Sequence, residues 1–513
     1  MPNTQLPTEK IDSHRVARGL GSTILARMGA VVELVAQPLY VLMFGLAGYG
    51  LYAVLWAAIN LAENIFDLGM TSAMQRTVPK SASHGEAAEA LRTALILGVG
   101  PCIIVAAGVS YFAEFIGPLL NVAQEEEALV VPAVRLFVWT LPLWAFVEIT
   151  TSALRARMVF GPEIRLRIVW EQIIRLTLAG ILFFAGMGLK GLFIAHIVSL
   201  SITAILCVRL LNRYYKLELL RHGSLFGETA KHTFWAGISI LPSNVIARTF
   251  SDAPALVLNL LLPGAAGAKA AGLFTIARKL SSVVQLVRTA FVYVMAPLAA
   301  SAERANRSQV RDIYSYAVRL ILAIAFPLAT VIATGRSSIL SLFGDQALVA
   351  KSAVTILLFG RALEALFGIS VPVLQVIAAY RHQIVASFVG VSVAVLVGWE
   401  TVELFEPLTA IAFATATGFV TMASIPMLQL FVTEKLHPFD SRFPSVFVRV
   451  AAVSVIAGLV SRMASRMLPD AVAIPTIAAI ALLAMWSSLR IALPDEDRAS
   501  LGKIARTLRL VKR

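Results

Sequence analysis

The sequence predicts an all-α polytopic membrane protein of about fourteen transmembrane helices, with two six-helix lobes related by a pseudo-twofold axis and two C-terminal helices. Three observations predict this fold: the apolar composition, a succession of long apolar segments, and a short repeat between the two halves. Hydrophobic residues make up 58% of the 513 positions and charged residues 14%, and the mean hydropathy is +0.80. Such a composition is typical of a chain solvated by a bilayer and excludes a water-soluble globular domain.

Long apolar segments recur at the length that a membrane span requires. A helix needs about 20 mostly apolar residues to cross the hydrocarbon core, and fourteen segments meet this requirement. They lie near residues 20–45, 49–73, 88–113, 130–154, 168–186, 189–209, 233–262, 270–298, 314–343, 350–378, 383–399, 408–432, 444–464 and 471–492. We group them as an N-terminal lobe (1–216), a C-terminal lobe (217–440), two further helices (441–492) and a basic tail (493–513).

The distribution of basic residues predicts the orientation in the membrane. With both termini in the cytoplasm, the inner segments hold 29 of the 44 Lys and Arg residues, and the outer segments hold six. Because cytoplasmic loops carry such an excess, we expect both termini to be cytoplasmic. The same asymmetry explains the net charge of +14, and no motif indicates nucleic-acid binding.

A short repeat relates the two predicted lobes. Residues 24–27 read Ile-Leu-Ala-Arg and residues 245–248 read Val-Ile-Ala-Arg, at an offset of 221. Residues 50–52 and 272–274 each read Gly-Leu followed by an aromatic residue, at an offset of 222. An even number of spans per repeat leaves both halves in the same orientation, so we expect parallel repeats with a substrate site between them.

The remaining nine of the 44 basic residues are placed inside the spans, where a cation costs about 2.5 to 3.5 kcal/mol and normally faces a polar interior or a partner. They are Arg27, Arg135, Arg175, Arg248, Arg278, Lys279, Arg288, Arg319 and Arg361. Single members could instead lie at span ends or form ion pairs within one helix, as Glu171 with Arg175 and Arg361 with Glu364 could. The nine together favour a transport path.

Arg27 and Arg248 occupy equivalent positions in the repeat, and two guanidinium groups that face one cavity suit an anion such as a phosphate. We predict a substrate-binding cationic cavity and a set of gate or ion-coupling residues. The cavity set is Arg27, Arg248, Arg278, Lys279, Arg288 and Arg361, and the gate or coupling set is Glu33, Glu63, Asp67 and Asp252. No catalytic residue, metal site or cofactor is predicted.

Glu63 and Asp67 have i, i+4 spacing and lie at the depth expected for Arg27. They could form a gate with Arg27, bind a coupling cation or belong to a salt-bridge network. We favour the gate or the network over the ion site.

The first 80 residues carry a pattern that is similar to a known family. It comprises residues 38–40 (Pro-Leu-Tyr), the turn through Gly45 and Gly48 into residues 49–53, and residues 66–70 (Phe-Asp-Leu-Gly-Met) followed by Arg76. These residues resemble the N-terminal region of bacterial polysaccharide flippases, which belong to the multidrug/oligosaccharidyl-lipid/polysaccharide exporter superfamily.

The resemblance implies two lobes around a cationic cavity, alternating access, and an undecaprenyl-diphosphate-linked oligosaccharide as substrate. It implies a place in the bacterial cell inner membrane and in cell-surface polysaccharide biosynthesis, either of lipopolysaccharide or of exopolysaccharide. Membrane lipids and a polysaccharide polymerase or export protein are the implied partners.

Two other functions stay open. A drug/cation antiporter of the same superfamily would have an interior dominated by carboxylates, whereas nine interior cations favour an anionic headgroup. A membrane polysaccharide polymerase or glycosyltransferase would need a sizeable outer domain, and the outer segment near 114–129 holds only acidic charges. No GxxxxGK[ST] loop occurs, so we expect an ion gradient or substrate supply to drive transport.

Three smaller features complete the predictions. Cys102 and Cys207 are far apart in apolar segments, which favours packing roles over a disulfide or a zinc site. His196, in an apolar helix, is expected to be packed rather than to relay protons. Within residues 495–513, apolar side chains recur at helical spacing among basic ones, which predicts either an interfacial helix or a disordered basic tail.

Overall fold

The computed structural model is helical along the part of the chain that it describes. It describes the backbone of residues 13–157, 159, 166, 170–215, 227–303, 307–377, 381–501 and 503–510, and the side chains of residues 35–157, 159, 166, 170–215, 227–289, 310–374, 384–501 and 505–510. No residue in these ranges lies in a β-strand. The prediction of an all-α polytopic fold is confirmed.

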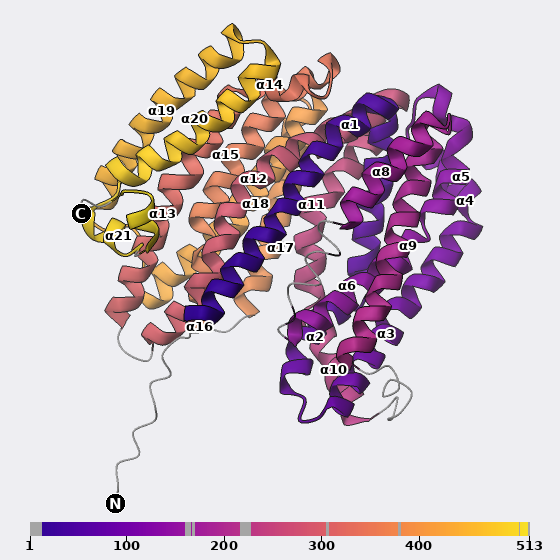
Figure 1. The fold of residues 1–513 in the computed structure, drawn as a ribbon, viewed down its shortest axis with the longest axis horizontal. Helices are drawn as coiled ribbons and strands as arrows, with labels where there is room; N and C mark the ends of the chain where they lie inside the picture. Colours follow the sequence, from indigo (N-terminus) through magenta and orange to yellow (C-terminus); the bar gives the residue numbers. More distant parts are fainter. Residues whose placement is uncertain are drawn as a thin grey trace, which may run out of the picture. The chain divides into compact units, whose positions relative to one another are not determined.

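Long helices follow one another with short connections (Figure 1). The helices are α1 (Ser13–Phe66), α2 (Met70–Thr77), α3 (His84–Tyr111), α4 (Ala113–Ile116), α5 (Glu127–Phe137), α6 (Thr140–Ala156), α8 (Glu171–Phe184), α9 (Gly188–Tyr215), α10 (Glu228–Ile238), α11 (Leu241–Leu261), α12 (Gly264–Glu303), α13 (Arg307–Thr334), α14 (Arg336–Ser341), α15 (Lys351–Phe367), α16 (Ser370–Ile377), α17 (Arg381–Thr401), α18 (Pro407–Glu434), α19 (Phe443–Met467), α20 (Asp470–Ile491), α21 (Asp495–Ala499) and α22 (Lys503–Thr507). Short 3₁₀ turns are η1 (Val78–Lys80), η2 (Gly117–Leu119), η3 (Gln124–Glu126) and η6 (Asp345–Ala350).

The chain folds as two compact units. Unit 1 comprises Met1–Met43, Ala62–Pro118 and Ala128–Leu241, and unit 2 comprises Phe44–Leu61, Leu119–Glu127 and Pro242–Arg513. The predicted lobe boundary at residue 216 rests on the order of the predicted spans along the chain, and it stays a prediction.

Eleven helical segments in the described residues are long and apolar enough to cross a membrane, fewer than the fourteen spans predicted. The predicted spans 20–45 and 49–73 correspond to two helices that α1 joins across a kink at Gly45, where φ is 72°, and the second of them ends at Phe66. The predicted span 168–186 contains α8, which has only 14 residues. The predicted span 233–262 is divided between α10 and α11.

Unit 1 has a core formed by α2, α3, α6 and α9. Met70 of α2 is buried with Leu91 of α3 and Ile149 of α6. Tyr215, at the end of α9, is buried in the same cluster, and its hydroxyl donates a hydrogen bond to the carbonyl oxygen of Ala153 at 2.8 Å. Because the buried hydroxyl has a partner, the aromatic ring joins α9 to α6 without an unsatisfied polar group.

Unit 2 packs its helices through small residues. A Cβ atom built on Gly360 of α15 would lie 2.6 Å from the Cβ of Ala416 on α18. The helices α13, α19 and α20 pack against one another (Figure 1), and a Cβ on Gly458 of α19 would lie 2.9 Å from Thr330 of α13. Since lipid provides no hydrophobic force between apolar helices, van der Waals contact at small residues stabilises their association.

The two glycines of the sequence repeat meet in unit 2. A Cβ built on Gly50 of α1 would lie 1.8 Å from the carbonyl oxygen of Ala268 on α12, and one built on Gly272 would lie 3.2 Å from the carbonyl oxygen of Leu46. Both the two glycines and the two facing residues differ by 222 in number. The contact is therefore reciprocal at the offset of the repeat, as a twofold axis between α1 and α12 requires.

We expect Gly50→Ala to destabilise the protein, because the new methyl group must separate two helix backbones. Overpacking of this kind costs about 1–3 kcal/mol. The matched control is Gly100→Ala in α3, where a Cβ would meet no atom within 4 Å. Thermal denaturation of the detergent-solubilised protein should give a lower melting temperature for Gly50→Ala than for Gly100→Ala. Equal melting temperatures would contradict the close crossing.

Candidate functional site

A buried carboxylate joins two arginines inside unit 2. Glu364 on α15 accepts a hydrogen bond from Arg361, three residues earlier, at 2.6 Å, and another from Arg288 on α12. All three residues lie in segments that are apolar enough to span a membrane. A buried ion needs direct, hydrogen-bonded partners to offset its desolvation. The pair within α15 is confirmed, and Arg288 extends it to a second helix.

Aromatic and small residues position these guanidinium groups. The Cζ atom of Arg361 lies 3.6 Å from the centre of the Phe419 ring on α18, and Phe419 packs on Phe250 of α11 with ring centres 5.4 Å apart. Gly368 leaves space for Arg288, because a Cβ at Gly368 would lie 2.8 Å from the Arg288 Nε atom. Cation–π contact and close packing therefore restrict both side chains.

A second ion pair links α11 to α12. Asp252 is buried and accepts a hydrogen bond from Arg278 at 3.1 Å. Arg248, one turn before Asp252, is exposed, and it has no ion-pair or hydrogen-bond partner in the described part of the chain. Lys279 is half-buried. Asp252 thus neutralises Arg278, whereas Arg248 keeps its full donor capacity.

These residues give the helices α11, α12 and α15 of unit 2 an excess of positive charge. The middle parts of α11, α12 and α15 carry five cations and two carboxylates. The side chains of the carboxylates Asp252 and Glu364 are 2% and 3% exposed, whereas those of Arg278 and Arg288 are 20% and 22% exposed. A guanidinium group has five N–H donors, so both arginines keep donors for an anion.

One predicted gate residue stabilises a turn in unit 1. The helix α1 ends at Phe66, before the predicted limit of 73, because Leu68 and Gly69 have φ values of 52° and 73°. The two carboxylate oxygens of Asp67 accept hydrogen bonds from the backbone N–H groups of Gly69 at 2.7 Å and Thr71 at 3.1 Å. Asp67 therefore stabilises the start of α2.

Two more of the predicted gate residues, Glu33 and Glu63, lie on α1. Glu63 is buried and accepts a hydrogen bond from the Asn64 side chain at 2.8 Å. Glu148 on α6 is buried as well. Arg27 and Glu33 lie in α1 but outside the residues whose side chains are described, so a contact of Arg27 with Glu63 stays a prediction.

Two further interior cations form local ion pairs. Arg175 is buried and pairs with Glu171 on the same helix, which confirms the i, i+4 alternative. Arg135 pairs with Glu114 at 3.2 Å, and both side chains are exposed. His196 is buried against the ring of Phe137, with ring centres 5.1 Å apart, in agreement with a packing role.

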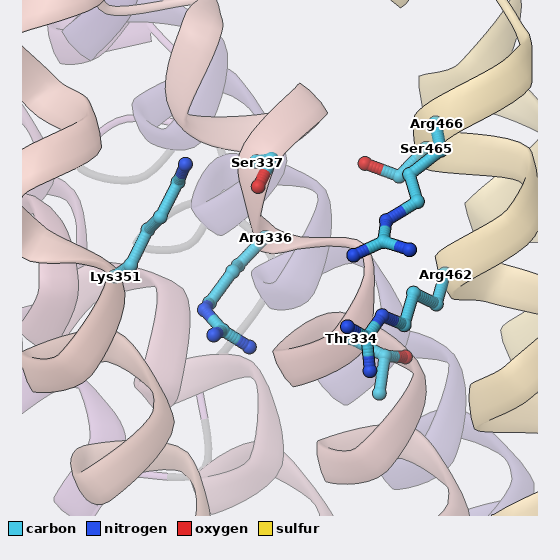
Figure 2. A pocket seen from close by; sticks show the side chains of 7 residues that line it. All are labelled: Thr334, Arg336, Ser337, Lys351, Arg462, Ser465 and Arg466. Carbon is cyan, nitrogen blue, oxygen red and sulfur yellow. The ribbon is translucent and has the colours of Figure 1, made fainter.

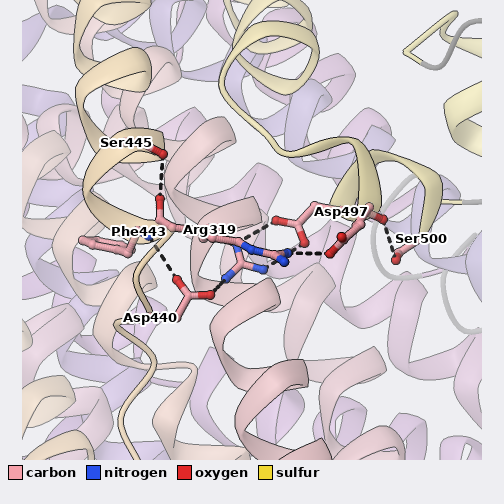
Figure 3. A network of polar contacts seen from close by, with 8 residues as sticks. Arg319, Asp440, Phe443, Ser445, Asp497 and Ser500 are labelled. Atoms are coloured by element: carbon pink, nitrogen blue, oxygen red, sulfur yellow. Dashed lines mark hydrogen bonds and ion pairs between the residues drawn. The ribbon is translucent and has the colours of Figure 1, made fainter.

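Arg319 connects three parts of unit 2. Its side chain lies between Asp440, which precedes α19, and Asp497 of α21 (Figure 3). The Nε and Nη2 atoms donate hydrogen bonds to the two carboxylate oxygens of Asp497 at 2.7 and 2.8 Å. This bidentate pair attaches the C-terminal segment to α13. Arg319 is therefore structural and does not contribute to a cationic cavity.

The prediction of one interfacial helix over residues 495–513 is wrong for the described residues. Two helices of five residues each, α21 and α22, replace it. The indole N–H of Trp486 donates a hydrogen bond to the carbonyl oxygen of Leu508 at 2.9 Å, and Leu510 is buried. The segment folds back on unit 2 because Asp497 and these contacts hold it there.

The described residues contain no group of three or more His, Cys, Asp or Glu side chains that could hold a metal ion.

Comparison of the sequence with known protein families shows to which family the chain belongs. A family described as polysaccharide biosynthesis protein matches residues 43–352, more than half of the chain. The chain belongs to this family. No curated protein sequence matches this chain significantly.

Solved structures share its fold. The lipid II flippase MurJ, in an inward closed conformation, matches with a TM-score of 0.72 and 12% sequence identity, over 92% of this chain and 98% of that chain. An inward-facing multidrug resistance MATE family transporter of the MOP superfamily matches with a TM-score of 0.62 and 17% identity, over 79% and 99%. A mutant of the Vibrio cholerae MATE transporter VcmN matches with a TM-score of 0.60 and 13% identity, over 83% and 98%. The protein therefore has the fold of these flippases and transporters, as the sequence predicts.

We expect Glu364→Gln to destabilise the protein strongly. The change leaves Arg288 and Arg361 without their carboxylate, and removing one partner of a buried pair costs about 3–5 kcal/mol. The control is Glu114→Gln, which breaks an exposed pair worth about 0–1 kcal/mol. The measurement is thermal denaturation of both variants in detergent. A Glu364→Gln variant as stable as Glu114→Gln would exclude a structural role for the pair.

Proposed function

We propose that this family member is a flippase that moves an undecaprenyl-diphosphate-linked oligosaccharide across the bacterial inner membrane by alternating access, for cell-surface polysaccharide biosynthesis. The observation that carries the proposal is the excess of positive charge in α11, α12 and α15 of unit 2, in a chain of the polysaccharide biosynthesis family. The fold shared with a lipid II flippase supports a lipid-linked substrate.

The diphosphate is the part of this substrate that the cationic residues suit. A diphosphate brings about two negative charges into the membrane, where an unpaired ion is costly. Arg278 and Arg288 offer partly exposed guanidinium groups that are already held in place by Asp252 and Glu364. Charge-assisted hydrogen bonds from such preorganised arginines replace part of the lost hydration.

Arg248 has a distinct part in this proposal. It is exposed and has no protein partner in the described part of the chain, so binding an anion there does not require a carboxylate to be displaced. The polyprenyl tail stays in lipid while the headgroup moves. A drug/cation antiporter would need a cation site, and the five cations of α11, α12 and α15 oppose one in this part of unit 2.

We expect Arg248→Gln to lower the transport rate by about tenfold to a hundredfold, because a hydrogen bond to a charged group contributes about 1.5–3 kcal/mol. Arg248→Lys should restore only part of the rate, since Lys lacks the planar fork. The assay follows a fluorescent lipid-linked oligosaccharide across liposomes that contain the purified protein.

The matched control is Arg449→Gln on α19, which also removes one exposed arginine without a protein partner in the described residues. It should transport like the unchanged protein. Normal transport by Arg248→Gln, at normal insertion, would contradict the role of Arg248 in binding.

We further propose that Glu63 acts as a gate by contact with Arg27. Asp67 already uses both carboxylate oxygens on backbone amides, which leaves Glu63 as the better partner. An anionic substrate and Glu63 would then compete for the same arginine, so binding would open the gate. The alternative is that Glu63 binds the driving cation.

A Glu63→Gln variant separates these roles. The gate predicts that the variant keeps its dependence on an ion gradient but accumulates in one access state, as measured by accessibility labelling. Glu114→Gln, an exposed acid on α4, serves as the control. Loss of ion dependence with normal exchange between access states would refute the gate and support the cation site.

A further inference from the structure

Four cations surround one cavity in unit 2, away from the residues proposed to bind substrate. The cavity has a volume of about 270 Å³. Its lining consists of Thr334, Arg336, Ser337, Lys351, Arg462, Ser465 and Arg466. Figure 2 shows Arg462 and Arg466 extending from α19 toward the side where Arg336 and Ser337 lie. No acidic residue contributes to the lining.

Close packing between α13, α14 and α19 builds this cavity. The hydroxyl of Ser461 donates a hydrogen bond to the carbonyl oxygen of Val331 at 2.9 Å. The hydroxyl groups of Ser338 and Ser465 are hydrogen-bonded at 2.9 Å. A Cβ on Gly335 would lie 2.8 Å from the Ser461 hydroxyl oxygen. The two walls that carry the cations are therefore fixed against each other.

The cations of this cavity lack acidic partners. None of the four forms an ion pair with an acidic residue in the described part of the chain. Arg462 and Arg466 are one turn apart on α19, an arrangement in which like charges repel. The Nε atom of Arg336 is buried and has no hydrogen-bond partner among the described residues. Burial and the nearby Arg462 lower the pKa of Arg336 below its usual value.

Four positive charges at one cavity are unusual in segments that are predicted to lie on the outer side of the membrane. On the orientation that the positive-inside rule predicts, only six basic residues of the chain lie in outer segments. Four of these six line this one cavity. Random placement of so few cations would not be expected to bring four of them together, and the repulsion between like charges opposes it. A ligand of opposite charge supplies the missing partner.

We propose that this cavity binds a phosphate-bearing anion at the outer membrane surface. Three guanidinium groups and one ammonium group suit the several oxygens of a phosphate or diphosphate, and the hydroxyl groups of Ser337 and Ser465 add further donors. The volume of about 270 Å³ leaves room for a diphosphate. This site is independent of the proposed transport substrate.

Binding by the detergent-solubilised full-length protein tests the proposal. Inorganic pyrophosphate and dihexanoyl phosphatidylglycerol are titrated separately, and calorimetry gives the dissociation constant. We expect the double variant Arg462→Gln, Arg466→Gln to bind at least tenfold more weakly. Arg462→Lys, Arg466→Lys keeps the charge and should bind with intermediate strength. It also gives a second measurement if the Gln variant folds poorly.

The matched control is Lys190→Gln, Lys269→Gln, which removes the two remaining outer cations and lies outside the cavity. It should bind like the unchanged protein. Binding of either probe that depends on Arg462 and Arg466 supports the site, and the probe that binds more tightly identifies a lipid headgroup or a soluble phosphate as the source. Binding equal in all variants, or absent for both probes, overturns the proposal.

A separate labelling experiment tests whether the cavity lies at the outer membrane surface. A Ser337→Cys variant is treated with a membrane-impermeant maleimide, and the natural Cys102 and Cys207 give little background because they are buried. We expect labelling from the outside that pyrophosphate slows. Labelling only after permeabilisation would overturn the placement at the outer surface.

Discussion

Charge inside an apolar solvent must be paired or must serve a ligand, and this constraint organises unit 2. Glu364 illustrates it, because one carboxylate satisfies Arg361 on its own helix and Arg288 on α12. The pairing joins α12 to α15 more specifically than apolar packing could, since lipid and leucine are equally apolar. Asp252 has the same effect between α11 and α12. Because these pairs fix the positions of the charged side chains, the cations that exceed the carboxylates lie at defined places in unit 2.

Composition and the length of the apolar segments predicted the fold class well, because the bilayer imposes its apolar character and its thickness directly on the sequence. The spans 20–45 and 49–73 predicted two helices, and α1 consists of two helices joined across a kink at Gly45. The predictions were less accurate where a helix ends for local reasons. The turn at Leu68 and Gly69 ends α1 before the predicted limit, and Asp67 there accepts hydrogen bonds from two backbone amides.

The candidate site was predictable only in part. Spacing within a helix identified the pairs of Arg175 with Glu171 and of Arg361 with Glu364, because such neighbours meet in any helix. Spacing cannot reveal that Arg288 reaches Glu364, 76 residues away, or that Asp497 reaches Arg319, 178 residues away. These contacts depend on which helices pack together, and that information is tertiary.

The glycine contact between α1 and α12 has a consequence for how the sequence can change. Gly50 faces Ala268 as Gly272 faces Leu46, so the contact is isologous, like the interface of a symmetric homodimer enclosed within one chain. Each glycine is restricted by the backbone of the other half, and a backbone cannot be trimmed to accommodate a new methyl group. The two halves can lose almost all of their similarity, yet these two positions remain coupled for as long as the helices cross there.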